Sequence, residues 1–342
     1  MAELRRREVG RTGLAVPVLG FGGAPLGDLY EKIPHERAYA TIEAAWEAGA
    51  RLFDTAPLYG HGLSEHRFGH VLRDKPRAGY VLSTKVGRWL EPHDPATLDR
   101  GQWTGGLNMT WTYDYSYDGT LRAIDQSFQR LGIERIDILL IHDLDIWSHG
   151  SRAAYEAQLE IAMDGAYRAL DRLRREGVIR ALGLGVNETE PCVRFATRCE
   201  VDCFLLAGRY TLLEQGGLDD LLPLAIEKSI SFLLGGPFNS GILATGAVPG
   251  ARYDYKEAPP AIMERVRRIE AVCRHHDVPL KAAAIQFPLG HARVASIIPG
   301  AVRPEEVVEN ARLIRHPIPA DLWAELRHEG LLRPEAPVPV PV

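Results

Sequence analysis

Four polar side chains of chemically useful types follow short apolar runs in the sequence. Asp54 and Tyr59 stand in the segment FDTAPLYG, Lys85 in LSTKVG and His142 in LLIHD. A phenol can exchange a proton with a substrate oxygen, and a neighbouring cation lowers a phenol pKa that is otherwise about 10. We therefore expect Tyr59 to act as a general acid or base, with Lys85 as that cation.

The other two residues have supporting tasks in the same chemistry. Asp54 would hold the Lys85 ammonium in place through a charge-assisted hydrogen bond. His142 would orient the reacting oxygen through an N–H donor. This chemistry needs no metal ion, and we expect none.

Two other patterns allow an alternative interpretation. His66 and His70 are four apart on a predicted helix near His61, and the three could ligate a metal ion. A solvent-facing helix surface explains the spacing equally well, and no further ligand is required nearby. The run Gly20–Pro25 resembles half of a dinucleotide-binding fingerprint, but its third glycine position is Pro. We favour a helix surface for the histidines and a tight turn for the glycines.

The elements that must position these residues alternate along the chain. Apolar runs rich in Val, Ile, Leu and Phe predict strands of a parallel sheet buried on both faces, and helical patterns follow them. The predicted strands are Val18–Gly22, Leu52–Thr55, Tyr80–Lys85, Ile136–His142, Ala181–Val186, Asp202–Leu206, Phe232–Gly235 and Ala295–Pro299. The predicted helices include His35–Ala48, Glu65–Leu72, Gly119–Leu131, Ala166–Glu176, Leu218–Lys228 and Pro260–His275.

Eight such repeats predict a (β/α)8 TIM barrel, an α/β fold that takes up the whole chain, 1–342, as one domain. Catalytic residues of these barrels lie at the carboxyl ends of the strands. The ends of the second, third and fourth predicted strands bring the four polar residues to one rim. The predicted fold and the predicted chemistry therefore agree.

Three segments do not belong to the repeat. Residues 2–15 predict a hairpin, with a turn at Gly10 or Gly13, that plugs the amino-terminal mouth of the barrel. Residues 88–117 predict a loop much longer than usual, and such loops are usually functional. The proline-rich tail 334–342 predicts an extended arm.

Composition excludes several classes of protein. The chain has 46% hydrophobic and 25% charged residues and a net charge of -5, which is ordinary for a soluble globular protein. The basic cluster Arg5–Arg7 is too short for a nucleic-acid footprint, and no run of 18 apolar residues predicts a membrane span. We expect a cytoplasmic protein with a small-molecule substrate and no nucleic-acid or membrane partner, its oligomeric state open. The cysteines are expected to be reduced: Cys192, Cys199, Cys203 and Cys273.

The contexts of the four polar residues, together with the segments Gln126–Gly132, Gly183–Asn187 and Ile298–Asn310, resemble the aldo-keto reductase family over nearly the whole chain. The resemblance implies that Asp54, Tyr59, Lys85 and His142 form the catalytic tetrad. It also implies a nicotinamide cofactor that lies across the barrel mouth, with its adenosine held after the eighth strand. The implied cofactor contacts are Gly22, Asn187, Pro237, Gly241, Pro299, Gly300, Arg303, Glu306, Glu309 and Asn310.

Some positions depart from the pattern of the family. Many members hold the nicotinamide with a Ser-Asn pair, a Gln and a stacking Tyr, where this chain has Asn187-Glu188, Ala207 and Gly235. Members that bind NADP usually carry basic residues where this chain has Gly300 and Glu306. Since a carboxylate repels a 2′-phosphate, we expect NAD to be preferred, although Arg303 could bind the phosphate of NADP.

Three further segments, 114–118, 141–150 and 207–213, resemble the branch of NAD-dependent aldose dehydrogenases, for L-fucose and D-threo-aldoses, and pyridoxal 4-dehydrogenases. This resemblance implies oxidation of an aldose to its lactone. Aromatic residues crowd the long loop, as a wall over a substrate ring or as packing against the barrel: Trp89, Trp103, Trp111, Tyr113, Tyr115 and Tyr117. The expected substrate contacts are Trp111, Tyr113 and Trp147 for the ring, and Asp143, Asp145 and His149 for hydroxyls.

Three alternatives to an aldose dehydrogenase stay open at this point. The first is a pyridoxal 4-dehydrogenase, because the same aromatic wall would stack a pyridine ring. The second is an NADPH-dependent carbonyl reductase, which differs at the adenosine end of the cofactor site. The third and most remote is a regulatory subunit that binds the cofactor without turnover.

Overall fold

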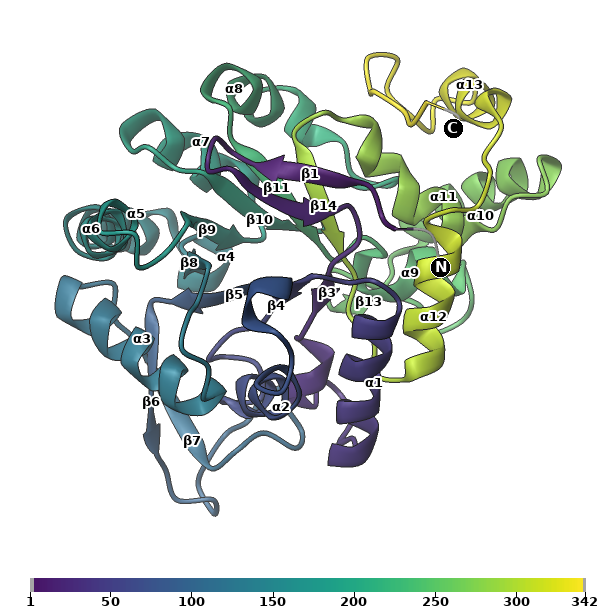
Figure 1. Ribbon diagram of the computed structural model, residues 1–342. Helices are drawn as coiled ribbons and strands as arrows, with labels where there is room; N and C mark the ends of the chain where they lie inside the picture. Colours follow the sequence, from purple (N-terminus) through teal and green to yellow (C-terminus); the bar gives the residue numbers. More distant parts are fainter. Residues whose placement is uncertain (1–2, 341–342) are drawn as a thin grey trace.

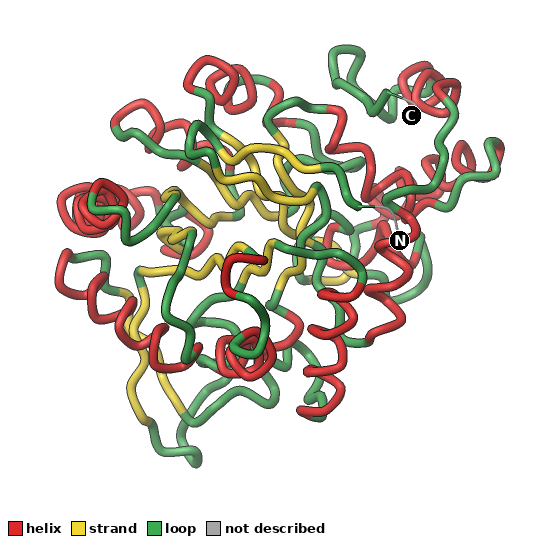
Figure 2. Tube along the Cα trace, viewed as in Figure 1, coloured by secondary structure: helices red, strands yellow, loops and turns green. Residues whose placement is uncertain are grey.

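Eight parallel strands form the centre of the molecule, and helices surround them (Figures 1 and 2). The computed structural model describes residues 3–340, so residue 2 of the expected hairpin and residues 341–342 of the expected tail lie outside it. In order around the sheet the strands are β3 (Phe21–Gly22), β4 (Leu52–Asp54), β5 (Val81–Val86), β8 (Ile138–His142), β9 (Ala181–Val186), β10 (Cys203–Ala207), β11 (Ser231–Gly235) and β14 (Val294–Ile298).

Two parallel bridges, Leu19 with Ile297 and Gly22 with Gly300, join the first and last strands and close the barrel. The predicted (β/α)8 barrel is therefore confirmed, with strand ends shifted by at most three residues. Most of the strand residues are buried, which explains the continuous apolar runs in the sequence. The core lies between the sheet and the outer helices.

The larger helices are α1 (His35–Glu47), α2 (Leu63–Leu72), α3 (Tyr117–Leu131), α5 (Arg152–Ala162), α6 (Arg168–Arg175), α7 (Thr189–Arg198), α8 (Leu221–Lys228), α10 (Pro260–His275), α11 (Leu280–Gln286), α12 (Pro304–Leu313) and α13 (Ala320–His328). Two single-turn helices stand at the mouth, α4 (Ile146–His149) and α9 (Ile242–Thr245). A π-helical turn over Met163–Tyr167 joins α5 to α6, so the predicted helix Ala166–Glu176 is the end of a longer one.

The expected amino-terminal hairpin is present and reaches Pro17. Its strands β1 (Arg6–Val9) and β2 (Leu14–Pro17) pair antiparallel, and both turn glycines have positive φ. Val9, Leu14 and Val16 pack against residues at the beginnings of the barrel strands. The Arg7 guanidinium donates to the carbonyls of Leu289, His291 and Val294. The hairpin therefore closes the amino-terminal end of the barrel.

The segment 88–117 is not only a loop. It forms an antiparallel ribbon of β6 (Arg88–Pro92) and β7 (Met109–Tyr113). Threonine and aromatic residues, which favour strands, alternate in β7. The tip of the ribbon folds back, and Trp103 pairs with Leu29. A second short ribbon, β12 (Arg252–Tyr253) with β13 (Lys256–Glu257), follows α9.

The carboxyl-terminal tail packs on the barrel without forming a helix or strand over residues 333–340. Arg327 donates to the carbonyl of Ala336, which is fully buried. Pro337 and Val338 lie against Gly290 so closely that a Cβ there would collide with them. The four cysteines are free thiols. Within residues 3–340 no helix is long and apolar enough to cross a membrane.

Candidate active site

Lys85 and Asp54 form a buried ion pair at the carboxyl ends of β5 and β4. Lys85 Nζ lies 2.7 Å from Asp54 Oδ2 and donates to the carbonyl of Thr55 at 2.7 Å. Ser83 donates to the other Asp54 oxygen at 2.8 Å. On β9, which is separated from β5 by β8, Gly185 has no side chain, and a Cβ there would lie 3.2 Å from Lys85 Cε. The glycine therefore leaves room for the lysine stem.

Tyr59 follows β4 in a turn that packs against another loop. The two loops are in backbone contact at Gly27 and Gly60. The contact is possible because neither residue has a Cβ, which would come within 2.5 Å of the other loop. The turn brings the Tyr59 ring over Lys85, whose Nζ lies 4.8 Å from the ring centroid. Both residues thus lie where the sequence places them.

The expected lowering of the Tyr59 pKa is wrong for this geometry. Burial raises the pKa of Tyr59 well above 10, the Asp54 and Asp143 carboxylates raise it further, and only the Arg88 guanidinium opposes them. Lys85 is paired with Asp54 at 2.7 Å, so the carboxylate offsets much of its charge. The phenol is therefore protonated at neutral pH and is poised as a proton donor.

His142 ends β8 and meets the Tyr59 ring edge to face, with 5.8 Å between centroids. Burial, with the cations of Arg88 and Lys85, lowers the pKa of His142 well below 6.5. The imidazole is therefore neutral. It retains one N–H, which is the donor that we expect His142 to supply.

Arg88 was not among the expected site residues, yet it contacts several of them. Its Nη1 lies 3.3 Å from His142 Nδ1, and its Nη2 donates to Asp143 at 2.7 Å and to the Tyr113 hydroxyl at 2.5 Å. It stands three residues after Lys85 at the start of β6. Sequence reasoning missed it because the segment looked like a loop, which gives no direction to a side chain.

Asp143 and Tyr115 complete this network. Asp143 has a positive φ of 51°, in the left-handed region that non-glycine residues rarely adopt. The Tyr115 hydroxyl donates to the carbonyls of His142 and Asp143. The strained turn directs the Asp143 carboxylate toward Arg88, so one of its oxygens is already engaged.

Trp103 is the aromatic residue that contacts Tyr59. Its ring lies 5.6 Å from the Tyr59 ring, and it is buried. Trp111 and Tyr113 pack on the Arg88 guanidinium instead, with centroid distances of 4.8 and 4.2 Å. The aromatic residues of the long segment therefore do line the site, but which of them contacts the phenol depends on how the ribbon folds.

Around α4, three expected substrate contacts have other partners. Asp145 is fully buried and accepts from the amides of Ser148 and Asn187, so its assignment as a hydroxyl partner is wrong. His149 lies 3.3 Å from the Tyr115 hydroxyl. Trp147 is 46% exposed and packs against Tyr255, with 5.5 Å between the rings.

Positions expected to hold the nicotinamide lie at the ends of β9, β10 and β11. Glu188 accepts from the first amides of α4, which explains a glutamate beside Asn187. The Asn187 backbone is fixed by Asp145 and Arg209, and its side-chain amide has no hydrogen bond within residues 3–340. Ala207 pairs with Gly235, and these two small residues put no bulky side chain at this rim.

After β11 the chain makes a tight turn at the mouth. Gly236, Asn239, Ser240 and Gly241 all have positive φ, and Asn239 bonds to Thr211 and to the carbonyl of Gly208. Pro237 and Gly241, two expected cofactor contacts, stand in this turn.

Gly22, Pro299 and Gly300 have a structural task in closing the barrel. Gly22 donates to the Pro299 carbonyl at 3.1 Å. A Cβ on Gly300 would lie 2.6 Å from two atoms of the Pro25 ring. Since Pro25 fills this space, a lysine or arginine at position 300 would require the Pro25 loop to move.

Residues around α12 differ in their availability to a ligand. Glu306 accepts from the amide of Val302, and Glu309 is paired with Lys281 at 2.5 Å. Arg303 is exposed, and its guanidinium has no hydrogen bond or ion pair in the described part of the chain.

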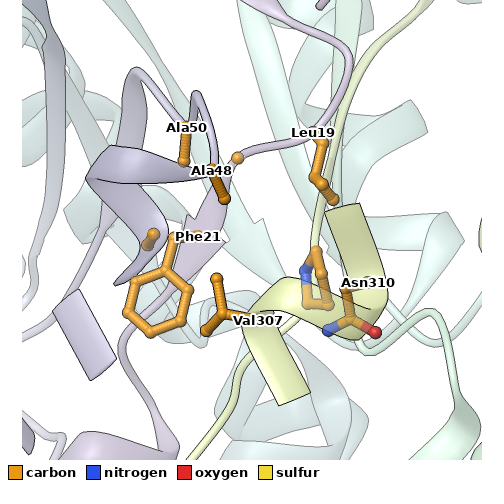
Figure 3. Close-up of a pocket in the computed structure, with 9 residues that line it drawn as sticks. Leu19, Phe21, Ala48, Ala50, Val307 and Asn310 are labelled. Atoms are coloured by element: carbon orange, nitrogen blue, oxygen red, sulfur yellow. The ribbon is translucent and has the colours of Figure 1, made fainter. Parts of the chain in front are cut away.

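Asn310 faces the crevice between α1 and α12 (Figure 3). Its Oδ1 is buried and has no hydrogen-bond partner among the described residues. The crevice holds about 10 Å³, which is near the volume of one water molecule. Asn310 therefore keeps an acceptor that water or a ligand amine would satisfy.

The histidines of the metal alternative do not converge. The His61 ring is bonded to the carbonyl of Met109, and His70 stacks on Tyr39 at 4.0 Å. Within residues 3–340, the group with metal-ligand spacing is instead His275, His276 and Glu325, on outer helices.

The geometry therefore presents a partly exposed phenol, a buried lysine–carboxylate pair and a neutral histidine at the carboxyl rim of a barrel. The sequence pattern that defines the Aldo/keto reductase family matches residues 18–328. The chain belongs to this family. As an aldo/keto reductase, the protein is an oxidoreductase that uses a nicotinamide cofactor.

Two curated relatives of this aldo/keto reductase cover almost the whole chain. A pyridoxal 4-dehydrogenase of Microbacterium luteolum is 43% identical over 337 residues, which span 96% of this chain and 98% of that protein. A D-threo-aldose 1-dehydrogenase of a Pseudomonas species is 41% identical over 327 residues, 94% and 96% of the two chains. An aldo-keto reductase structure from Bacillus halodurans, in its holo form, matches with a TM-score of 0.74 at 24% identity, over 95% and 96% of the chains. This last likeness supports the fold.

Three features of the reductase fit a nicotinamide cofactor. Ala207 and Gly235 are small where a flat ring would approach the rim, and the Asn187 amide is without a partner in the described chain. The orphaned oxygen of Asn310 offers an acceptor at the opposite end. When bound, the cofactor accepts or supplies a hydride.

Proposed function

We propose that this enzyme oxidises an aldose, in its pyranose form, at the anomeric carbon to a lactone, with NAD as the hydride acceptor. The observation that carries the proposal is the arrangement in which Tyr59 contacts the buried residues Lys85, His142 and Trp103. A polar ring needs an apolar surface and hydrogen-bonding groups in the same place. Trp103 supplies the first, and the Arg88–Asp143 network supplies the second.

The residues divide the proton chemistry between them. In oxidation the anomeric C–H bond breaks as hydride leaves, and the hydroxyl proton passes to Tyr59, so lactone, NADH and one proton are the products. Tyr59 must be ionised to receive that proton, whereas its protonated form serves the reverse reaction. The neutral His142 donates an N–H to the same oxygen. Lys85 is positioned by Asp54 to stabilise the phenolate.

Specificity for hydroxyl groups would come from the buried polar network. Asp143 and Tyr113 are fixed by Arg88, so their free lone pairs have defined directions. A site built to bond hydroxyls rejects analogues that lack them much more strongly than an apolar pocket does. This supports a sugar over a simple aldehyde.

The preference for NAD is supported at the adenosine end. Gly300 cannot be replaced by a basic residue without displacing Pro25, and the Glu306 carboxylate would repel a 2′-phosphate. Arg303 is the exposed cation nearby in sequence, so it is the residue through which NADP would still bind.

Turnover measurements test the proposal. The purified protein is supplied with NAD or NADP and with L-fucose, D-arabinose, L-galactose, pyridoxal or simple aldehydes, and the absorbance of reduced cofactor is followed. We expect the highest kcat/KM for an aldose with NAD. Absence of aldose oxidation with either cofactor, alongside fast oxidation of pyridoxal, would overturn the sugar assignment.

Pyridoxal oxidation is the second candidate function. The 43% identical relative supports it, and Trp103 over Tyr59 would stack a pyridine ring as well as a sugar. Product analysis separates the candidates, since pyridoxal would yield its own lactone. NADPH-dependent carbonyl reduction and a regulatory role without turnover are outcomes of the same assay, and a cytoplasmic location stays a prediction.

A further inference from the structure

A buried arginine outside the tetrad contacts His142. Arg88 is 3% exposed, and its Nη1 lies 3.3 Å from His142 Nδ1. Its Nη2 is bonded to Asp143 Oδ2 and to the Tyr113 hydroxyl. The Asp143 carboxylate balances the charge of the Arg88 guanidinium. This pairing offsets the free-energy cost of burying the guanidinium beside the His142 imidazole.

The contact determines which imidazole nitrogen carries the proton. A guanidinium has five N–H donors and no acceptor. Arg88 must therefore donate the hydrogen bond, and His142 Nδ1 must accept it with a lone pair. An imidazolium has no free lone pair on either nitrogen, so the charged ring is incompatible with this contact. The one N–H of His142 is consequently on Nε2.

The Nε2 atom is placed to use that N–H on a ligand. Asp143 Oδ1 lies 3.5 Å from Nε2, which is longer than a well-formed hydrogen bond. The imidazole meets the Tyr59 ring edge to face. A substrate oxygen between the two residues can therefore take the Nε2–H bond and share a proton with the phenol.

We propose that Arg88 is a positioning residue that keeps His142 as the neutral Nε2–H tautomer, by donating to Nδ1 while Asp143 balances its charge. The proposal rests on the function proposed above, because it assigns His142 to the orientation of the substrate oxygen. It explains why a buried arginine stands within three residues of the catalytic lysine.

The groups around His142 determine what removal of Arg88 would do. Lys85 faces it from β5, Tyr59 from the loop after β4 and Asp143 from the adjoining turn. Burial and the cations of Arg88 and Lys85 hold the pKa of His142 well below 6.5. Without Arg88, Nδ1 loses its donor and Asp143 stays unbalanced, so both protonation and the other tautomer become accessible.

The tautomer can be observed in the wild-type protein without substrate. Nitrogen-15 NMR of the histidine rings, assigned with a His142→Gln variant, distinguishes a protonated nitrogen from one with a lone pair. We expect Nδ1 of His142 to be the lone-pair nitrogen throughout about pH 5–8. A proton on Nδ1, or an imidazolium in this range, would overturn the proposal. The readout is independent of turnover, so its failure is distinguishable from a failed aldose assay.

Variants then test the consequence for catalysis. Arg88→Met should lower kcat by up to about 100-fold, with little change in cofactor affinity, and should add a loss of kcat/KM on the acidic side of the pH profile. Arg88→Lys keeps a charge and a donor but not the fork that reaches two partners, so its loss should be intermediate. The matched control is Arg122→Met. Arg122 is an exposed arginine on α3 that packs on Trp89, the residue after Arg88 in β6.

The outcomes separate positioning from simple packing. Wild-type pH dependence and an unchanged His142 tautomer in a folded Arg88→Met protein would contradict the assignment. If that variant does not fold, the wild-type NMR measurement and the Arg88→Lys pH profile decide.

Discussion

Lys85 Nζ lies 2.7 Å from Asp54 Oδ2, and both side chains are almost completely buried. Removal of one partner from such a pair leaves an uncompensated charge in a medium of low polarity. We expect Asp54→Leu to destabilise the protein by about 3–5 kcal/mol and the double variant Asp54→Leu/Lys85→Met to recover much of this. Urea unfolding measures both. Glu190→Leu, which breaks an exposed pair with Arg152, should leave the unfolding midpoint almost unchanged.

Tyr59→Phe removes the proton-transfer group and leaves the ring. We expect turnover to fall by roughly 100-fold or more, the usual range for a general acid or base. Cofactor affinity should change little. Tyr39→Phe, on α1, is the matched control, and near wild-type turnover in Tyr59→Phe would refute the assignment.

The pH dependence of turnover should differ between the two directions. Since the pKa of Tyr59 is raised well above 10, only a small fraction is ionised at neutral pH. Oxidation needs the ionised form, so its kcat/KM should rise as pH increases from about 7 to 10, whereas reduction should not. An oxidation rate that is flat over this range would show that Tyr59 is not the base.

His291 should make stability depend on pH in the acidic range. Burial and the neighbouring cations of Arg293 and Arg7 lower the pKa of His291 to about 4, and its Nδ1 accepts from the Arg293 amide. Above about pH 6.5 the ring is neutral in both folded and unfolded chains. As pH falls toward 4, only the unfolded chain takes up the proton, so this residue should cost up to about 3 kcal/mol of stability.

Unfolding free energies of wild type and His291→Gln between pH 7 and pH 4 test this. The variant should lose less stability over the range. His328→Gln, at an exposed position, should behave as wild type. Equal pH dependence in all three proteins would remove His291 as the cause.

Arg303 should matter for NADP rather than NAD. Its guanidinium is exposed, with no partner in the described part of the chain, and a charge-assisted bond to a 2′-phosphate is worth about 1.5–3 kcal/mol. We expect Arg303→Ala to lower kcat/KM with NADP by at least about tenfold, with little change for NAD. A higher kcat/KM with NADP than with NAD in the wild type would refute the NAD preference.

The fold and the placement of the four polar residues at one rim were predictable because they follow local rules. Buried parallel strands have continuous apolar runs, and the polar residues at the carboxyl ends of β4, β5 and β8 must lie at one rim. The hairpin at the amino terminus was also predictable, since its turn glycines and alternating apolar residues are local signals.

The ribbon of β6 and β7 was not predictable in the same way. Its partners are separated by many residues, and whether two extended segments pair depends on what they pack against. The roles of Arg88 and Trp103 therefore could not be derived, because each depends on a long-range contact. Asp145 failed as a substrate contact for a similar reason: its sequence neighbourhood is polar, but its oxygens cap α4.

The sequence by itself determined the barrel, the family and the placement of Asp54, Tyr59, Lys85 and His142 at one rim, because residue type and spacing along each strand carry that information. Only the tertiary structure decided the protonation states and the walls of the site. A pKa depends on burial and on charges brought together from different elements. The pKa of Tyr59 is therefore raised rather than lowered. In the same way, the pKa of His142 is lowered by burial and by the cations of Arg88, 54 positions away in the chain, and Lys85.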